Sequence, residues 1–90
     1  MSEWKHDEGK RQWHLLPTKQ LESVIDVLQY GAQKYSEDSW RKVEDGKRRY
    51  YNAAMRHLAE WAKGERLDPE SGLHHLAHAA VNCLFIMGLE

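Results

Sequence analysis

The stretch from residue 79 to residue 89 constrains the fold most, because it is apolar on nearly every side. A helix with this pattern has to be covered all round by other elements. Its start is predicted at Asp68, a good N-cap, with Pro69 at the first helical position and Glu70 in the first turn, where an acid complements the helix dipole. We therefore expect a helix that begins near residue 68 and continues through the apolar stretch.

Two further helices are predicted from apolar residues that recur at helical spacing. The first covers residues 18–34, and the second covers residues 46–63 with Gly64 after it as a C-terminal cap. Residues 36–45 show no period and predict a loop or single turn held by Trp40. No strand-like alternation appears, so the sequence predicts an all-α three-helix unit. The apolar positions are Leu21, Val24, Ile25, Leu28 and Ala32 in the first helix, and Tyr51, Ala54, Met55, Leu58 and Ala62 in the second.

The size of the chain predicts self-association. Three helices cannot easily surround residues 79–89, and a chain of 90 residues buries only a thin core. We therefore expect homo-oligomerisation, in which helices of several subunits pack into a larger bundle. Residues 1–12 are charged and predict a flexible N-terminal arm, whereas residues 13–90 predict a single all-α domain. Within that domain, residues 13–16 are expected to anchor the chain as an apolar strap.

Charge and hydropathy restrict the partners and the location. The formal net charge is -1, which gives no general reason to expect binding to nucleic acid or to a membrane. The first eight residues lack the apolar core of a signal peptide, and residues 79–89 are too few to span a bilayer. We expect a cytoplasmic protein of a bacterium or of a virus-infected cell.

Four side chains on two of the predicted helices form a candidate metal site. His57 and Glu60 are three residues apart and share one face of the second helix, and His75 and His78 repeat this spacing on the third. The short link between the two helices requires antiparallel packing, which allows the two pairs to face each other. A mixed nitrogen and oxygen set suits Zn, Mn, Fe or Ni, and Mg much less, because Mg²⁺ prefers oxygen ligands. In the competing interpretation, His57 and Glu60 form an intrahelical pair, while His75 and His78 are interhelical hydrogen-bonding groups.

Cationic and aromatic side chains predict a phosphate and base site beside these histidines. Arg49 and Arg56 lie two turns apart on one helix face, where guanidinium groups can bind phosphate oxygens in a fork. Trp40 and Tyr50 offer flat surfaces on which a base can stack. The further candidates for ligand contact are Lys34, near the end of the first helix, and Asn82, which either caps the polar face of the third helix or recognises a ligand edge.

Six segments carry a family resemblance. They are Leu15-Leu16-Pro17, Gly31-Ala32-Gln33-Lys34-Tyr35 with Trp40, Arg56-His57-Leu58, Gly64-Glu65, Leu67-Asp68-Pro69-Glu70-Ser71-Gly72 and His75-Leu76-Ala77-His78-Ala79. Read in order, they resemble the phage-encoded family named for the N-terminal domain of dATP/dGTP diphosphohydrolase, which is similar to the MazG-like all-α nucleoside triphosphate pyrophosphohydrolases. The resemblance covers about residues 13 to 88. It implies a helical, homo-oligomeric purine-nucleotide pocket, with Tyr35 among the residues at the ligand, in a phage-infected host cell.

The resemblance also implies a metal-dependent reaction. MazG-like enzymes use EExxE on one helix and ExxD on the next to hold Mg²⁺, which activates water for attack between the α and β phosphates. At the first motif this chain keeps only Glu60, and His75-Leu76-Ala77-His78, or His78 with Asn82, occupies the second. Since Mg²⁺ prefers carboxylate oxygens, this loss of acids weakens its binding.

Two functions from different classes follow. In the first, the chain is a dATP/dGTP pyrophosphohydrolase that releases dNMP and pyrophosphate, with Glu60 and His57 as catalytic residues and a divalent metal (Mn²⁺, Mg²⁺ or Zn²⁺) held by His57, Glu60, His75 and His78. In the alternative, it is a non-catalytic sponge that sequesters a host signalling nucleotide and so blocks anti-phage defence. A pocket rich in Arg and His but poor in acids suits that task, because carboxylates repel phosphate unless a metal lies between them. A purely structural interaction module would leave the imidazoles without a role.

Overall fold

The computed structural model describes residues 6–90, and its regular elements are helical. They are η1 (Trp13–Leu15), α1 (Thr18–Lys34), η2 (Ser39–Lys42), α2 (Gly46–Ala62) and α3 (His75–Leu89). Within residues 6–90 no strand forms, and the one bridge of strand type joins Leu67 to His74. The prediction of an all-α unit with three helices is confirmed. α1 covers the predicted residues, and α2 ends one residue before its predicted end.

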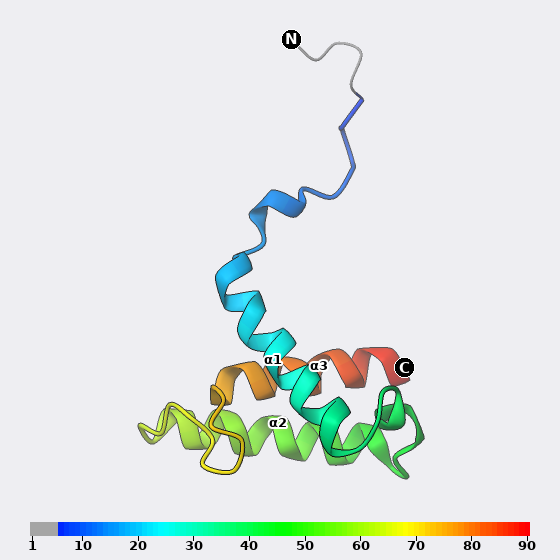
Figure 1. Cartoon of the computed structure of the whole chain (residues 1–90). Coiled ribbons are helices and arrows are strands. Elements are labelled where there is room, and N and C mark those ends of the chain that lie inside the picture. Colours follow the sequence, from blue (N-terminus) through cyan, green and yellow to red (C-terminus); the bar gives the residue numbers. More distant parts are fainter. Residues whose placement is uncertain (1–5) are drawn as a thin grey trace.

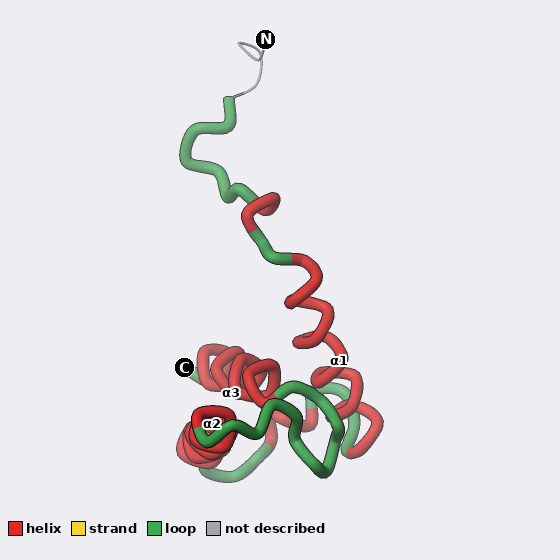
Figure 2. Tube along the Cα trace, turned by 90° about the vertical axis from the view of Figure 1, so that its left-hand side faces the viewer, coloured by secondary structure: helices red, strands yellow, loops and turns green. Residues whose placement is uncertain are grey.

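α2 and α3 lie side by side and run in opposite directions, while α1 crosses them (Figure 1; Figure 2). α1 packs against α3, with Val24 and Val27 at the contact, whereas the start of α1 points away from the α2–α3 pair, together with η1 (Figure 1). The antiparallel packing follows from the chain path, because the loop after α2 turns back over a short distance before α3 begins. It brings the middle of α2 beside the first turn of α3.

The predicted start of the third helix at Asp68 is wrong, since α3 begins at His75. The Asp68 carboxylate accepts a hydrogen bond from the Ser71 amide at 2.9 Å, as an N-cap would, but it closes a turn instead. Gly72 then has a φ of 74°, a left-handed conformation that ends any helical run. The actual N-cap is His74, whose imidazole accepts from the Leu76 amide at 3.1 Å.

The core is small and consists of Val and Ala side chains. Its buried apolar members are Val27, Ala54, Ala77, Ala79 and Val81. The expectation that residues 13–16 anchor the chain is not met, because Trp13 and Leu15 are 70% and 71% exposed. Within residues 6–90 these side chains stay exposed, because η1 and the start of α1 extend beyond the α2–α3 pair (Figure 1).

The N-terminal arm predicted at residues 1–12 is described only in part. Residues 1–5 lie outside the described residues, and residues 6–12 contain a turn but no regular element. Of the helices in the described part, none is both long enough and apolar enough to cross a membrane.

Trp40 holds η2 against the end of α3, as the sequence predicted for this loop. Its indole stacks on Phe85 with ring centroids 4.5 Å apart and an interplanar angle of 6°. The Tyr50 hydroxyl donates a hydrogen bond to the Trp40 carbonyl oxygen at 3.0 Å. These contacts fix the loop between α1 and α2 as one wall of the site described below.

Close packing at Trp40 leads to a stability prediction for Gly88. A Cβ atom at Gly88 would lie 2.6 Å from the Trp40 ring, which is held on its other contacts and cannot move freely. We expect Gly88→Ala to lower the free energy of unfolding by about 1–3 kcal/mol, the usual cost of overpacking. Urea denaturation measures it, with Gly31→Ala as the control, because a Cβ there meets no atom within 4 Å. Equal or higher stability of Gly88→Ala would contradict the packing described here.

Candidate functional site

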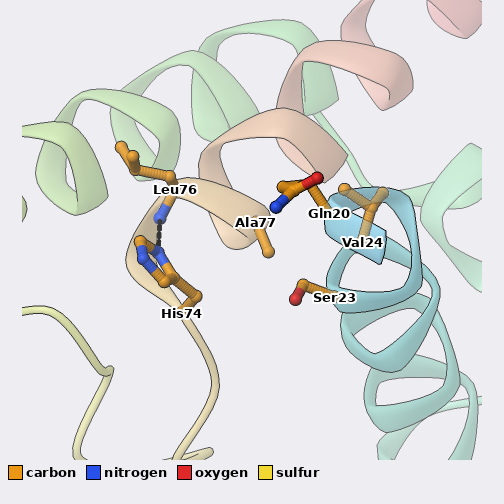
Figure 3. A pocket seen from close by; sticks show the side chains of 6 residues that line it. All are labelled: Gln20, Ser23, Val24, His74, Leu76 and Ala77. Carbon is orange, nitrogen blue, oxygen red and sulfur yellow. Dashed lines mark hydrogen bonds between the residues drawn. The ribbon is translucent and has the colours of Figure 1, made fainter. Parts of the chain in front are cut away.

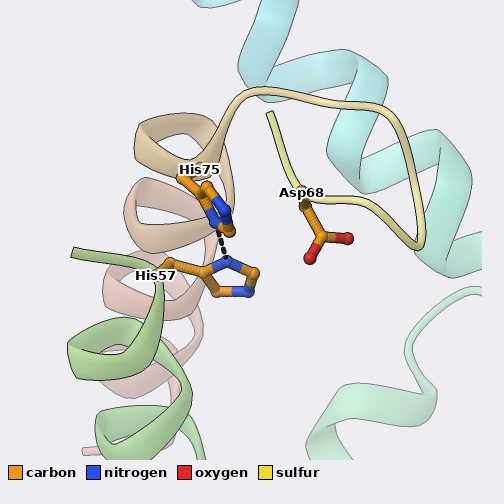
Figure 4. Close-up of side chains that lie close together, drawn as sticks. All are labelled: His57, Asp68 and His75. Atoms are coloured by element: carbon orange, nitrogen blue, oxygen red, sulfur yellow. Dashed lines mark hydrogen bonds between the residues drawn. The ribbon is translucent and has the colours of Figure 1, made fainter. Parts of the chain in front are cut away.

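Three histidines and one aspartate converge where α2, the start of α3 and the connecting loop meet. His57 comes from α2, His75 and His78 come from α3, and Asp68 comes from the loop. One ligand atom from each of His57, Asp68 and His75 lies within 4.8 Å of the others. Figure 4 shows the two imidazoles joined by a dashed line, with Asp68 beside them on the loop. The spacing of the histidines along the sequence thus translates into proximity in space.

A chain of hydrogen bonds links Glu65, His75 and His57. Glu65 Oε1 lies 2.7 Å from His75 Nε2, and His75 Nδ1 lies 2.8 Å from His57 Nδ1. A carboxylate only accepts, so His75 carries its proton on Nε2 and turns an unprotonated Nδ1 toward His57. His75 is 2% exposed, which makes it the most buried polar residue of the site.

His78 forms the other side of the cluster. Its Nε2 atom is 2.7 Å from Ser71 Oγ and 4.0 Å from Asp68 Oδ2. Its ring stacks on that of His57, with centroids 4.4 Å apart and an interplanar angle of 7°. The loop residues Asp68 and Ser71 are therefore fixed against α3 by the same imidazole.

Burial favours the neutral form of the His57 and His78 imidazoles. Burial lowers the pKa of His57 below its ordinary value, and the neighbouring His78 and His75 lower it further. Burial also lowers the pKa of His78. For Asp68, burial alone would raise the pKa of the carboxyl, but hydrogen bonds from the backbone and side chain of Ser71 bring it below its ordinary value. Near neutral pH the cluster therefore offers nitrogen lone pairs and one ionised carboxylate.

A cleft of about 820 Å³ opens beside the cluster, between α1, the η2 loop, α2 and α3. Its volume is in the range of small-molecule sites. The walls include His57, His78 and Asp68, whereas His75 lies behind them. All seven residues that the sequence assigned to nucleotide or phosphate contact also line it, namely Lys34, Tyr35, Trp40, Arg49, Tyr50, Arg56 and Asn82.

The cations of the cleft differ in their existing partners. Within residues 6–90, neither Arg49 nor Arg56 forms an ion pair. Lys34 Nζ is 2.6 Å from Glu70 Oε2, and hydrogen bonds to Glu70 and Tyr35 raise the pKa of its ammonium group. The two guanidinium groups are thus the cations with free hydrogen-bonding capacity toward a ligand.

The aromatic and amide groups of the cleft have structural contacts of their own. Trp40 is stacked on Phe85, and the Arg41 guanidinium lies 4.2 Å from its ring centroid. The Asn82 side-chain amide donates to the backbone carbonyl of His78 at 2.9 Å. Tyr35 is 70% exposed at the mouth of the cleft, which leaves its ring accessible.

The structure does not bring Glu60 into the cluster. Lys63 Nζ donates to Glu60 Oε2 at 3.0 Å, and Glu60 is not among the residues that line the cleft. Sequence reasoning overlooked Asp68, Glu65 and Ser71, because Asp68 and its neighbours read as the first turn of a helix. The segment from Asp68 to Gly72 did carry a sign of the loop, because its Ser and Gly favour a turn as much as they favour the start of a helix.

The donor set that the structure assembles does not fit Mg²⁺. Two imidazole nitrogens and one carboxylate face the same point, whereas Mg²⁺ prefers oxygen ligands in octahedral geometry. No second carboxylate from α2 supplements Asp68, since Glu60 is paired with Lys63.

A second, smaller pocket of about 220 Å³ lies between α1 and the start of α3. Figure 3 shows its lining, with Ser23 and Val24 from α1 on one side and Leu76 and Ala77 from α3 on the other. The one titratable group there, His74, is already used as the N-cap of α3. This pocket therefore offers little chemistry.

Comparison with known proteins agrees with the resemblance seen in the sequence. Residues 2–90 match the family described as dATP/dGTP diphosphohydrolase, N-terminal. A protein of Salmonella phage PMBT28, named dATP/dGTP diphosphohydrolase, is 40% identical to the chain over 87 residues. The match covers 94% of this chain but 29% of the phage protein, so the chain spans less than a third of the length of that relative. No solved structure matches the chain.

Proposed function

The chain belongs to the dATP/dGTP diphosphohydrolase N-terminal family, and from this premise we propose that its cleft binds a purine deoxynucleoside triphosphate and cleaves it to dNMP and pyrophosphate. The observation that carries the proposal is the cleft itself. Its lining includes Arg49 and Arg56, which form no ion pair within residues 6–90, together with the neutral imidazoles of His57 and His78. A relative named for this activity supports the same substrate class.

In the proposed complex, Arg49 and Arg56 bind phosphate oxygens through charge-assisted hydrogen bonds. Lys34 lines the same cleft, where its ammonium group is paired with the Glu70 carboxylate. Tyr35 and Tyr50 are the aromatic groups available to the base. Trp40 shapes the wall through its stack on Phe85. This arrangement directs the triphosphate toward the imidazoles and the base toward the mouth of the cleft.

At the α-phosphorus, the reaction forms one P–O bond and breaks another. The oxygen of a water molecule attacks the α-phosphorus, and the bond from that phosphorus to the α–β bridging oxygen breaks, so that pyrophosphate leaves with the electron pair. The proton of the water passes to the neutral imidazole of His78, or to His57 where His57 does not itself bind the metal, because the lowered pKa keeps the lone pair of that imidazole free. A divalent metal held by imidazoles of the cluster is part of the proposal, and it would supply Lewis-acid activation of the water.

Incubation of the chain with dATP or dGTP, in the presence of Mn²⁺, Zn²⁺ or Mg²⁺, tests the proposal through the release of pyrophosphate. Release of pyrophosphate by the unaltered chain, and its loss in Arg56→Ala, would support the proposed reaction. Tight binding with the intact nucleotide recovered after heat denaturation would instead support a nucleotide sponge. If no purine nucleotide shifts the melting temperature, both functions are excluded.

We also propose that the domain is of MazG-like type and assembles with copies of itself. Exposed apolar side chains support the assembly, since Leu84 and Met87 on α3 are 49% and 68% exposed. A second copy would cover the C-terminal half of α3, which is apolar nearly all round. Light scattering of the purified chain should then give a multiple of the 10.6 kDa subunit mass. A monomer at micromolar concentration would contradict this proposal.

A further inference from the structure

We infer that His57, His75 and Asp68 bind one divalent transition-metal ion, Zn²⁺ or Mn²⁺ rather than Mg²⁺, and that Glu65 holds His75 in the tautomer that a metal requires. The inference deepens the proposed function by naming the ion class and its ligands. It replaces Glu60 with Asp68 in the set expected from the sequence. Metal binding is measured without nucleotide, so its outcome is separate from that of the proposed reaction.

The distances favour a shared ion. The Nδ1 atoms of His57 and His75 are 2.8 Å apart. One ring nitrogen of each histidine and one carboxylate oxygen of Asp68 lie within 4.8 Å of one another. Two nitrogens bound to one ion at about 2.0–2.1 Å lie roughly 3 Å from each other, so very little movement separates the observed pair from a ligating pair. The ion would take the place of the proton that His57 Nδ1 donates to His75 Nδ1 in this hydrogen bond. Asp68 is held in place because it accepts from the Ser71 amide.

Glu65 supplies the second partner that metal-ligating histidines usually have. Ligating histidines almost always donate their other ring N–H to a carboxylate or carbonyl, which fixes the tautomer and makes the ligand more basic. Glu65 Oε1 lies 2.7 Å from His75 Nε2 in this way. The opposite nitrogen, Nδ1, is therefore unprotonated and directed at the centre of the cluster. A carboxylate, an imidazole and a candidate ion site thus lie in the order expected for a metal centre.

The type and position of the ligands select the ion. Two imidazoles with one carboxylate suit Zn²⁺ or Mn²⁺, while Mg²⁺ binds oxygen ligands and keeps several waters. His75 is almost fully buried behind the site, whereas His57 and Asp68 line the cleft. An ion bound by these residues would have protein on one side and the cleft on the other, where water or phosphate oxygen can complete its coordination.

Titration of the chelator-treated chain with ZnCl₂, MnCl₂ and MgCl₂, followed by calorimetry, tests the inference. We expect Zn²⁺ and Mn²⁺ to bind at one site per chain and Mg²⁺ to bind at least about tenfold more weakly. Asp68→Asn should weaken Zn²⁺ binding about a hundredfold, and Glu65→Gln should weaken it about 10- to 100-fold. With Co²⁺ as the probe, the visible absorption bands of the bound ion should be lost in the same variants.

Two variants guard against indirect effects. Glu60→Gln removes the competing carboxylate on α2 and should keep the Zn²⁺ affinity within about twofold, since Glu60 is held by Lys63. Glu22→Gln, at an exposed position of α1, is the control variant and should leave Zn²⁺ affinity unchanged. Circular dichroism shows whether each variant is folded. Failure of the unaltered chain to bind Zn²⁺ or Mn²⁺ below about 1 mM would overturn the inference. Unchanged Zn²⁺ affinity in the folded Asp68→Asn and Glu65→Gln variants would also overturn the inference.

Discussion

The His57→Ala variant is expected to turn over dATP and dGTP at least about a hundredfold more slowly than the unaltered chain, the usual contribution of a positioned acid–base group. His57 contacts both other imidazoles of the cluster and also lines the cleft. It lines the cleft, stacks on His78 and contacts His75 at 2.8 Å. Its removal therefore affects water activation and metal binding at once. Pyrophosphate release at saturating nucleotide is the measurement, because it reports kcat rather than affinity.

The same variant should bind nucleotide almost as tightly as the unaltered chain, since Arg49 and Arg56 remain in place. His14→Ala serves as the control, because His14 lies in exposed η1, outside the cleft. His57→Ala also leaves the buried Nδ1 of His75 without its partner, which should lower the free energy of unfolding by about 1–3 kcal/mol. Activity is therefore compared at a temperature where both variants are folded. Unchanged kcat in His57→Ala would exclude this imidazole from the reaction.

Excess metal separates the two roles of His57. If the imidazole acts mainly as a ligand, raising the concentration of Zn²⁺ or Mn²⁺ restores part of the lost turnover, because mass action refills a weakened site. If it acts mainly as the proton acceptor, added metal restores nothing. The two outcomes assign the role without a bound structure.

The helices could be predicted from the sequence because their signals are local. Apolar spacing in residues 18–34 and 46–62 reports the period of the helix directly. The start of α3 could not be fixed in this way, since Asp68 makes the same bond to the Ser71 amide in a turn as it would at an N-cap. The choice depends on Gly72 and on the bridge from Leu67 to His74, which joins residues seven positions apart.

The proximity of the histidines was also accessible from sequence, because spacing of three on antiparallel helices brings such residues together. The identity of the carboxylate was not. Glu60 and Asp68 were equally plausible by residue type, and the outcome depends on the rotation of α2 and on the path of the loop. The exposure of Trp13 could not be predicted from local sequence either. An apolar segment has the same sequence pattern whether it packs on its own chain or extends away from it.

The Arg56→Ala variant is expected to bind dGTP about 10- to 100-fold more weakly, as follows from the loss of a charge-assisted hydrogen bond to phosphate. Arg56 forms no ion pair within residues 6–90 and lies on the cleft wall beside His57. Arg56→Lys should recover only part of the affinity, since an ammonium group lacks the planar fork of guanidinium. Calorimetry with dGTP and deoxyguanosine measures both variants.

Arg48→Ala is the matched control for Arg56→Ala. It removes the same charge from the same helix, but Arg48 is paired with Asp45 and does not line the cleft. A general effect of net charge would weaken dGTP binding equally in both variants and would fade as salt is added, because long-range attraction is screened. A direct contact predicts a large loss in Arg56→Ala alone, and it predicts no loss for deoxyguanosine, which carries no phosphate. Equal losses in the two variants would remove Arg56 from the phosphate site.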